Sequence, residues 1–223
     1  MTEPYWSDEL LTLYCGDYME VIESIDIPEN SGWIVDPPWD CRHFISAGRK
    51  VVFCDGSRQQ DVIRMYGAPN WIFTWDCVSS WYTKNRPLRR AKYAFWYGPL
   101  SEYVFDGSHY GAPCGVRRSV SNSRGSYVFE PSEHGKHLSD IFSKPITSLH
   151  KNGHKHEKPI EWISMLVANC LGSSSVIVDP FAGSGVTLSA CRKIRKPCIA
   201  IEIDELTCER IATERLSQQE LAV

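Results

Sequence analysis

The sequence predicts an α/β fold whose core is a doubly wound, mostly parallel β-sheet. Short apolar runs rich in β-branched and aromatic residues alternate with segments of helical spacing, which is typical of such sheets. Several of these runs end in an acidic residue and a turn, as strands do at the ligand-binding edge of an open sheet. A chain of 223 residues is long enough for one sizeable α/β domain and short for two.

The amino-terminal part of the chain alternates between expected strands and helices. The strands have alternating or continuous apolar side chains, whereas the helices have apolar residues three or four positions apart. The strands are predicted at residues 11–15, 32–36, 50–54, 71–75 and 92–97. The helices are predicted at residues 19–25 and 58–66. We expect the first strand to end beside Gly16-Asp17 and the second to end at Asp36.

The composition and periodicity of the sequence change at Gly98. From there to about Lys151 the chain is rich in Gly, Ser, Pro and His with weak periodicity, which is typical of a long functional segment at the rim of a sheet. The alternation then resumes, with helices predicted at residues 158–167, 186–193 and 206–216 and strands at residues 176–179 and 198–203. We therefore expect a single domain over residues 1–223, with residues 99–151 embedded in it as an insertion.

The net charge and the cysteines limit the possible partners and the cellular compartment of the protein. The net charge of -3 and the pI of about 6.2 mean that affinity for a polyanion requires local clustering of basic residues. Nine cysteines without a Cys-x-x-Cys pair are typical of reduced thiols in an intracellular protein. No signal peptide opens the chain, and no apolar run approaches the ~20 residues of a membrane span. We expect a cytoplasmic protein with no membrane partner.

The first candidate site is Asp36-Pro37-Pro38-Trp39, directly after the apolar run at residues 32–35. Two prolines cannot continue a strand ladder, so the strand stops there and leaves backbone carbonyls without neighbouring N–H donors. The carboxylate and these carbonyls form a cluster of hydrogen-bond acceptors beside an indole ring. Such a cluster suits a flat aromatic substrate with an amino group, and a nucleobase with an exocyclic amine fits that description.

The second candidate site is Asp-Pro-Phe-Ala-Gly-Ser-Gly at residues 179–185, between a predicted strand and a predicted helix. Its paired glycines allow a close approach of the backbone to a ligand at the start of a helix. The third glycine of a dinucleotide fingerprint is absent, since Leu188 occupies that position, and the loop therefore does not indicate NAD. Glu202 ends the next strand 23 residues after Asp179, a spacing suited to the ribose hydroxyls of an adenosine.

A basic segment runs from Lys84 to Arg124, where eight Lys or Arg stand against two acids, a net charge of about +6. It is the predicted phosphate-facing rim, although a solvated loop would also explain some of its charges. The candidate phosphate-contacting residues in it are Arg89, Arg90, Arg117 and Arg118. Histidines at 134, 137, 150, 154 and 156 lack a Cys or acid at tetrahedral ligand spacing, so we expect no metal site.

With these motifs in view, the chain resembles the DNA amino-methyltransferases, which use S-adenosylmethionine to methylate N6 of adenine or N4 of cytosine. Residues 36–39 resemble the catalytic motif of that family, and residues 179–185 resemble its cofactor loop. The catalytic motif comes first, as in the permuted beta class, where a target-recognition segment separates the two motifs. The resemblance covers nearly the whole chain and implies a Rossmann-like methyltransferase sheet with an inserted target-recognition segment.

The resemblance also implies roles for individual residues. Gly16-Asp17 resembles the opening of such proteins, and Lys158-Pro159 with Glu161 resembles the helix start before the cofactor loop. The implied catalytic residues are Asp36, Pro37, Pro38 and Trp39. The implied residues for binding S-adenosylmethionine are Asp17, Lys158, Asp179, Phe181, Gly183, Gly185 and Glu202. Family members are often dimers, so a homodimer is also an implied assembly.

The expected substrate is DNA with a flipped-out base, because a base inside a duplex cannot reach such a site. Trp39 is the candidate for stacking on one face of the base, and Phe95, Trp96 or Tyr97 for the other. Asp rather than Ser before Pro-Pro favours adenine N6, by resemblance alone. Three alternatives stay open: a cytosine-N4 methyltransferase, an RNA adenine methyltransferase, and a catalytically silent nucleic-acid-binding partner subunit.

Overall fold

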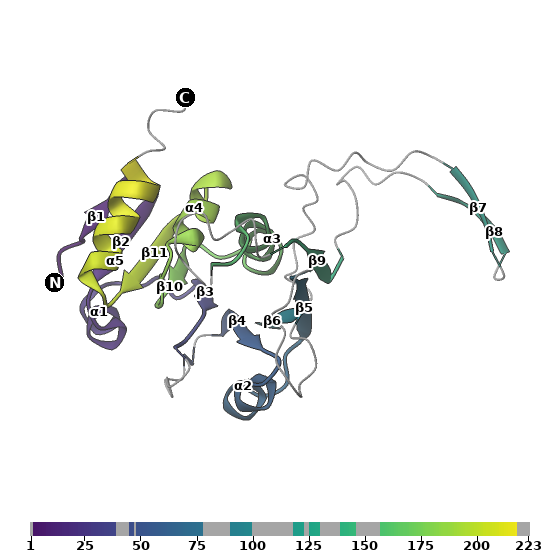
Figure 1. Ribbon diagram of the computed structural model, residues 1–223, viewed down its shortest axis with the longest axis horizontal. Helices are drawn as coiled ribbons and strands as arrows, with labels where there is room; N and C mark the ends of the chain where they lie inside the picture. Colours follow the sequence, from purple (N-terminus) through teal and green to yellow (C-terminus); the bar gives the residue numbers. More distant parts are fainter. Residues whose placement is uncertain are drawn as a thin grey trace.

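The computed structural model describes residues 2–38, 45–46, 48–77, 90–99, 118–122, 125–129, 139–145 and 157–217. A nine-stranded sheet runs through these residues in the order β1-β2-β11-β10-β3-β4-β6-β5-β9 (Figure 1). Its strands are β1 (Trp6–Ser7), β2 (Leu11–Cys15), β3 (Gly32–Val35), β4 (Arg49–Asp55), β5 (Trp71–Asp76), β6 (Ala91–Tyr97), β9 (Ile141–Ser143), β10 (Ile177–Asp179) and β11 (Cys198–Glu202). The prediction of an α/β fold around a large sheet is confirmed.

The direction of the strands decides which residues meet at each edge of the sheet. Five neighbouring strands, β2, β11, β10, β3 and β4, are parallel. Strand β1 is antiparallel to β2, and β6 is antiparallel to both β4 and β5, so the sheet is mixed. The carboxyl ends of β2, β11, β10, β3 and β4 therefore lie along one continuous edge, to which the start of β6 also belongs.

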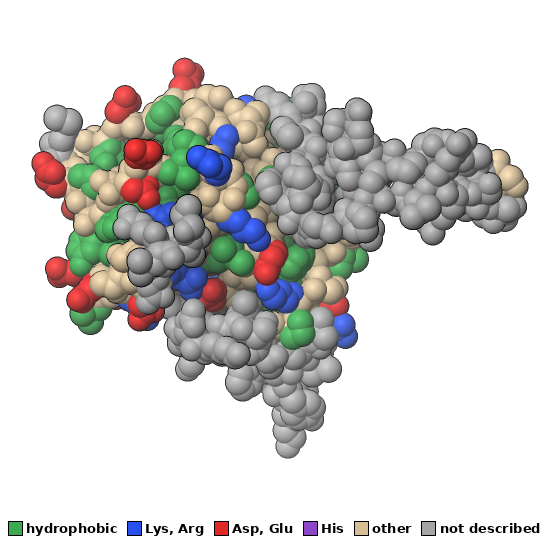
Figure 2. Space-filling view, turned by 90° about the horizontal axis from the view of Figure 1, so that it is seen from above, with side chains coloured by type: hydrophobic (Ala, Val, Ile, Leu, Met, Phe, Trp, Pro, Cys, Tyr) green, Lys and Arg blue, Asp and Glu red, His purple; other side chains and the backbone are tan. Residues whose placement is uncertain are grey.

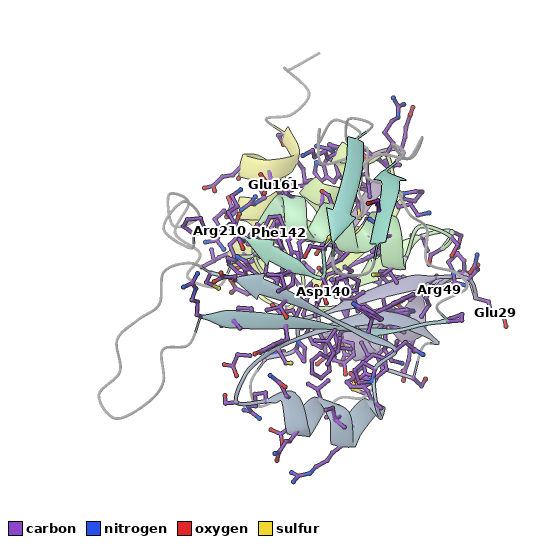
Figure 3. The ribbon with its side chains drawn as sticks, turned by 90° about the vertical axis from the view of Figure 1, so that its right-hand side faces the viewer. Glu29, Arg49, Asp140, Phe142, Glu161 and Arg210 are labelled. Carbon is purple, nitrogen blue, oxygen red and sulfur yellow. The ribbon has the colours of Figure 1, made fainter. Side chains whose placement is uncertain are left out.

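Helices cover both faces of the sheet, as in a doubly wound fold (Figures 1 and 3). The helices are α1 (Tyr18–Ser24), α2 (Gln59–Tyr66), α3 (Ile160–Cys170), α4 (Val186–Lys193) and α5 (Glu205–Arg210), which continues as the π-helix η5 (Ile211–Leu216). Helices α3, α4, α5 and η5 bury Trp162, Leu188 and Ile211 against one face. Helices α1 and α2 cover the other face, where Val62 of α2 packs with Val52 and Phe95.

Most element boundaries match the expected ones to within a few residues, and the differences have local causes. Strand β3 ends at Val35, so Asp36 is the first residue after the strand and not its last. The expected final helix is α-helical only to Arg210 and then widens into η5. Strands β1 and β9 were not expected, because two or three residues carry too little periodicity to be recognised.

The segment between β6 and β9 contains a hairpin of β7 (Arg118–Asn122) and β8 (Gly125–Phe129). These two strands pair with each other in a separate sheet, which lies apart from the nine-stranded sheet (Figure 1). Other residues of the expected insertion lie outside the described ranges, so its role stays a prediction. Within the described residues, no helix is both long and apolar enough to cross a membrane.

Candidate functional site

An acidic residue stands at or just after the end of each of the five neighbouring parallel strands. Because these strands run in the same direction, their carboxyl ends bring the five side chains to one edge of the sheet. In the order of the strands β2, β11, β10, β3 and β4, the residues are Asp17, Glu202, Asp179, Asp36 and Asp55. We name this set the acidic edge. It places both predicted motifs on adjacent strands, since β10 pairs directly with β3.

Asp36 leads from β3 into the proline pair. Its side chain is 44% exposed and forms an ion pair with Lys158. Strand β3 is held between β10 and β4, so the backbone that presents Asp36 is fixed from both sides. Pro37 and Pro38 follow without backbone N–H groups, which leaves this turn rich in hydrogen-bond acceptors. Trp39 lies outside the described residues.

Lys158 directly precedes Pro159, which caps α3, and its side chain is only 13% exposed. Its ammonium pairs with Asp36 and lies 4.5 Å from the centroid of the Phe53 ring. Phe53 belongs to β4, so residues from β4, the β3 end and the α3 start converge on one cation. The sequence implied contact of Lys158 with the cofactor, but gave no sign of its pairing with Asp36, 122 residues away.

The glycine loop after β10 is held against the end of β11. The backbone N–H of Gly183 donates to Glu202 Oε2 over 2.7 Å, and the N–H of Ala182 donates to the carbonyl of Ile201 over 2.8 Å. Gly183 and Gly185 have φ angles of 51° and 73°, in the left-handed region that favours glycine. A Cβ on Gly185 would also lie 2.9 Å from Ile211, so close packing between α4 and η5 requires a glycine there.

Asp179 is buried beneath this loop and holds its backbone. The carboxylate accepts hydrogen bonds from the N–H of Phe181 and from the side chain of Thr187. Burial, reinforced by the nearby Asp36 carboxylate, raises the pKa of Asp179 to about 6, although the two hydrogen bonds and Lys158 oppose this rise. With 3% of its surface exposed, Asp179 positions the loop rather than presenting its carboxylate to solvent.

The start of α1 lies beside the glycine loop. Asp17 caps this helix by accepting a hydrogen bond from the N–H of Met19 over 2.8 Å. Tyr18, the first residue of α1, packs against the Phe181 ring with 4.9 Å between ring centroids. The N–H of Gly16 donates to the backbone carbonyl of Glu202, so the ends of β2 and β11 are joined. The predicted cofactor-binding residues thus occupy three neighbouring strand ends and the start of α3.

The structure does not bring Trp96, the predicted stacking residue, to this edge. Strand β6 is antiparallel to β4, with Trp96 opposite Val51 near the amino-terminal edge of the parallel strands. The Trp96 side chain is 1% exposed and belongs to the core beneath α3. Phe95 and Tyr97 are also buried, in the cluster on the α2 face. The sequence placed these aromatic residues at a strand end but could not show which way the strand runs.

The same reversal brings the basic start of β6 to the acidic edge. Lys92, which sequence analysis did not single out, lies directly opposite Asp55 across the β4–β6 pair. Arg90 precedes β6 and binds Asp76 through two hydrogen bonds of 2.5 and 2.8 Å, while remaining 55% exposed. Of the other candidate DNA-contacting residues, Arg118 begins β7, whereas Arg89 and Arg117 lie outside the described residues.

Charge is unevenly distributed over the molecule. On the face seen in Figure 2, acidic side chains predominate at the end formed by β1, β2, α1 and α5, and basic side chains lie nearer the middle. Figure 3 shows Glu161 and Phe142 on the side of the sheet covered by α3. Arg49 and Glu29 lie near the amino-terminal ends of the parallel strands, away from the acidic edge (Figure 3).

In the described part of the chain, no group of three or more His, Cys, Asp or Glu could hold a metal ion.

A family model of DNA methylases matches residues 47–214 of this chain. Among curated proteins, the Type II methyltransferase M.HindIII of Haemophilus influenzae is 34% identical over 64 residues. That match spans 29% of this chain and only 21% of the relative.

Solved structures share the fold over nearly the whole chain. The M1.HpyAVI–SAM complex has a TM-score of 0.62 and 16% identity, and the match covers 91% of this chain and 98% of that one. The PvuII DNA methyltransferase, described as cytosine-N4-specific, has a TM-score of 0.61 and 13% identity, and the match covers 93% and 86% of the two chains.

Proposed function

The chain belongs to the family of DNA methylases, and from this premise we propose that it transfers a methyl group from S-adenosylmethionine to N6 of adenine in DNA. One observation carries the proposal. Asp36-Pro37-Pro38 and the loop at residues 179–185 follow adjacent parallel strands, β3 and β10, at the same edge of the sheet. A donor held by one loop and an amine held by the other would be close enough for direct transfer.

The residues around the glycine loop suit S-adenosylmethionine. Positive φ angles at Gly183 and Gly185 support a tight turn that a ligand can approach closely, and Glu202 stands beside the loop as a partner for ribose hydroxyls. The carboxylate of Glu202 accepts a hydrogen bond from the N–H of Gly183. It is therefore close enough to the loop to contact a ligand bound there. Lys158 supplies a cation for the amino-acid carboxylate of the ligand. When bound, S-adenosylmethionine supplies an electrophilic methyl group.

Asp36 and Pro37 would activate the target amine by hydrogen bonding. The lone pair of an exocyclic amine is delocalised into the ring, so the nitrogen is a poor nucleophile. Asp36 would accept one N–H and the Pro37 carbonyl the other, which holds the nitrogen pyramidal with its lone pair towards the methyl donor. Methylation makes the nitrogen acidic, and Asp36 would then take its proton. These reaction steps need no covalent intermediate between the base and the protein.

Base stacking is proposed for Trp39 alone. The motif places Trp39 next to the two prolines, and the indole ring would hold a flipped-out base over the acceptor cluster. Arg90 lies at the rim of the same edge, with more than half of its side chain exposed, and is proposed to contact a DNA phosphate. Trp96 takes no part in this proposal because it belongs to the core.

The proposal is tested by incubating the protein with labelled S-adenosylmethionine and unmethylated genomic DNA, heat-denatured DNA or RNA. We expect label in duplex DNA, and N6-methyladenine as the modified nucleoside in mass analysis. Label recovered only as 4-methylcytosine would replace adenine with cytosine as the target, and label only in RNA would change the substrate class. Absence of transfer to any substrate would favour the silent partner subunit.

The catalytic assignment is tested with Asp36→Asn, which keeps the size of the side chain and removes its charge. We expect methyl transfer to fall at least about 100-fold, because the carboxylate both orients the amine and takes its proton. Asp61→Asn is the matched control, since Asp61 lies on α2 in a solvent-exposed pair with Arg58. Equal transfer by Asp36→Asn and the unmutated protein would refute the assignment.

A further inference from the structure

Lys158 interacts with carboxylates from the two strand ends that form the proposed active site. Its ammonium pairs with Asp36 after β3 and acts electrostatically on Asp179 at the end of β10. The side chain is only 13% exposed, and the ammonium rests over the Phe53 ring. The cation is therefore confined to a small region next to both the acceptor cluster and the glycine loop.

The pairing of Lys158 conflicts with the proposed role of Asp36. A carboxylate oxygen that binds an ammonium is hindered from accepting a hydrogen bond from an incoming amine along the same direction. The pair occupies Oδ2 and draws the charge of the carboxylate towards Lys158, so Asp36 accepts the target amine more strongly once the pair opens or rearranges. Opening it without a replacement would leave a largely buried ammonium unpaired, which is costly. Asp179 acts on Lys158 only electrostatically, and its carboxylate is engaged by Phe181 and Thr187. A further carboxylate that pairs directly with Lys158 would remove that cost.

We propose that Lys158 exchanges carboxylates: it pairs with Asp36 in the free protein and with the amino-acid carboxylate of the cofactor in the loaded protein. Cofactor binding then releases Asp36 to accept the target amine. The inference rests on the proposed function, because the second carboxylate comes from S-adenosylmethionine. Lys158 is a positioning residue, since it acts on the amine through Asp36. The exchange forms and breaks only ion pairs, so no covalent bond changes.

The geometry favours such an exchange. Lysine carries its charge on a flexible four-carbon stem, so the ammonium can turn from one carboxylate to another while its base stays fixed before α3. The Phe53 ring supports the ammonium in either position through its electron-rich face. Two carboxylates that compete for one cation are thermodynamically linked: each weakens the binding of the other by the same factor, so removing the Asp36 carboxylate should strengthen the binding of the ligand carboxylate.

This linkage is tested by isothermal titration calorimetry with two probes, S-adenosylhomocysteine and its decarboxylated analogue S-adenosyl-3-thiopropylamine. Asp36→Asn frees Lys158, so we expect it to tighten binding of S-adenosylhomocysteine at least about fivefold and to leave the decarboxylated analogue unchanged. Lys158→Met should weaken S-adenosylhomocysteine alone. In the Lys158→Met background, Asp36→Asn should no longer tighten either probe, because the shared cation is gone.

The double variant separates the exchange from simple charge repulsion. If Asp36 only repelled the ligand carboxylate, Asp36→Asn would tighten S-adenosylhomocysteine equally with and without Lys158, which would overturn the inference. The matched control is Lys144→Met with Glu161→Gln, a nearby lysine–carboxylate pair with distances of 2.7 and 2.8 Å, which should show no such linkage. Lys158→Gln is the second variant if Lys158→Met does not fold.

The outcomes also distinguish this inference from the proposed function. Binding of both probes without the predicted linkage would overturn the exchange and leave the proposed function standing. If neither probe binds the unmutated protein, S-adenosylmethionine dependence fails, and the exchange fails with it.

Discussion

Asp36 and Asp179 are chemically identical side chains at adjacent strand ends, but their surroundings give them different roles. Asp36 is 44% exposed and pairs with Lys158, so its carboxylate can meet a ligand at the edge of the sheet. Asp179 is 3% exposed and is engaged by Phe181 and Thr187 within the loop. The sequence identified both acids from their place after apolar runs. It could not assign their burial, because burial depends on helices and loops distant in the chain.

The burial of Asp179 predicts how stability changes with pH. Its pKa is raised to about 6 from the ordinary value of 3.8, so the folded state binds this proton more tightly than the unfolded state. The resulting stability is fully present below pH 3.8 and is lost as the pH rises through 6. Asp179→Asn removes this dependence, so the variant should gain about 2–3 kcal/mol relative to the unmutated protein between pH 4 and pH 7.5.

Urea unfolding of both proteins across this pH range measures the change. The difference between the two free energies of unfolding, rather than either value alone, isolates this carboxyl group from the other titrating residues. A difference that stays constant from pH 4 to pH 7.5 would contradict a raised pKa for Asp179.

At the scale of elements, local patterns were read correctly and long-range pairing was not. Strand β2 and helix α4 have the residue ranges that the sequence predicted, because their apolar spacing and flanking glycines are local. The direction of β6 follows from its pairing with β4 and β5, which no local pattern records. Because β6 runs antiparallel to β4, Trp96 lies away from the candidate site and Lys92 lies at its edge. The pairing of Lys158 with Asp36 was missed for the same reason.

The two glycines of the loop should differ in their tolerance of substitution. A Cβ at Gly183 meets no heavy atom closer than 3.8 Å, so Gly183→Ala carries only the cost of a positive φ, about 1 kcal/mol. A Cβ at Gly185 would lie 2.9 Å from Ile211, so Gly185→Ala adds a steric clash to that strain and should cost about 3 kcal/mol in total. Chemical denaturation of both variants gives the comparison, and equal losses would contradict the packing of Gly185 against η5.

The reversed direction of β6 predicts how residues near its two ends affect DNA binding. Arg90→Gln should weaken DNA binding and reduce the slope of log K against log salt by about one, as expected for one lost phosphate contact. Trp96→Phe should destabilise the fold by about 1–3 kcal/mol but leave the DNA affinity unchanged, because Trp96 lies in the core. Fluorescence anisotropy at several salt concentrations measures both, with Arg64→Gln on α2 as the control. A reduced slope in Trp96→Phe and not in Arg90→Gln would reverse the assignment.

At the scale of the whole molecule, the hairpin of β7 and β8 is structurally separate from the sheet that carries the site. Replacing residues 118–129 with a short Gly/Ser linker should therefore change the melting temperature by less than about 4 °C and leave S-adenosylhomocysteine binding intact. DNA binding should fall if this segment belongs to the target-recognition insertion. Thermal unfolding and calorimetry test the first part, and a large drop in melting temperature would show that the hairpin supports the core.

The acidic edge has a consequence for turnover. Under the proposed function, its row of carboxylates attracts a donor whose sulfur carries a positive charge, and methyl transfer converts that sulfur to a neutral thioether. Two unit charges about 4 Å apart attract each other by about 1 kcal/mol in water and about 4 kcal/mol near a protein surface. That attraction is lost once the methyl group has been transferred. The solvent-facing carboxylates of the acidic edge would therefore bind fresh S-adenosylmethionine more tightly than the neutral, spent product, without any movement of the sheet.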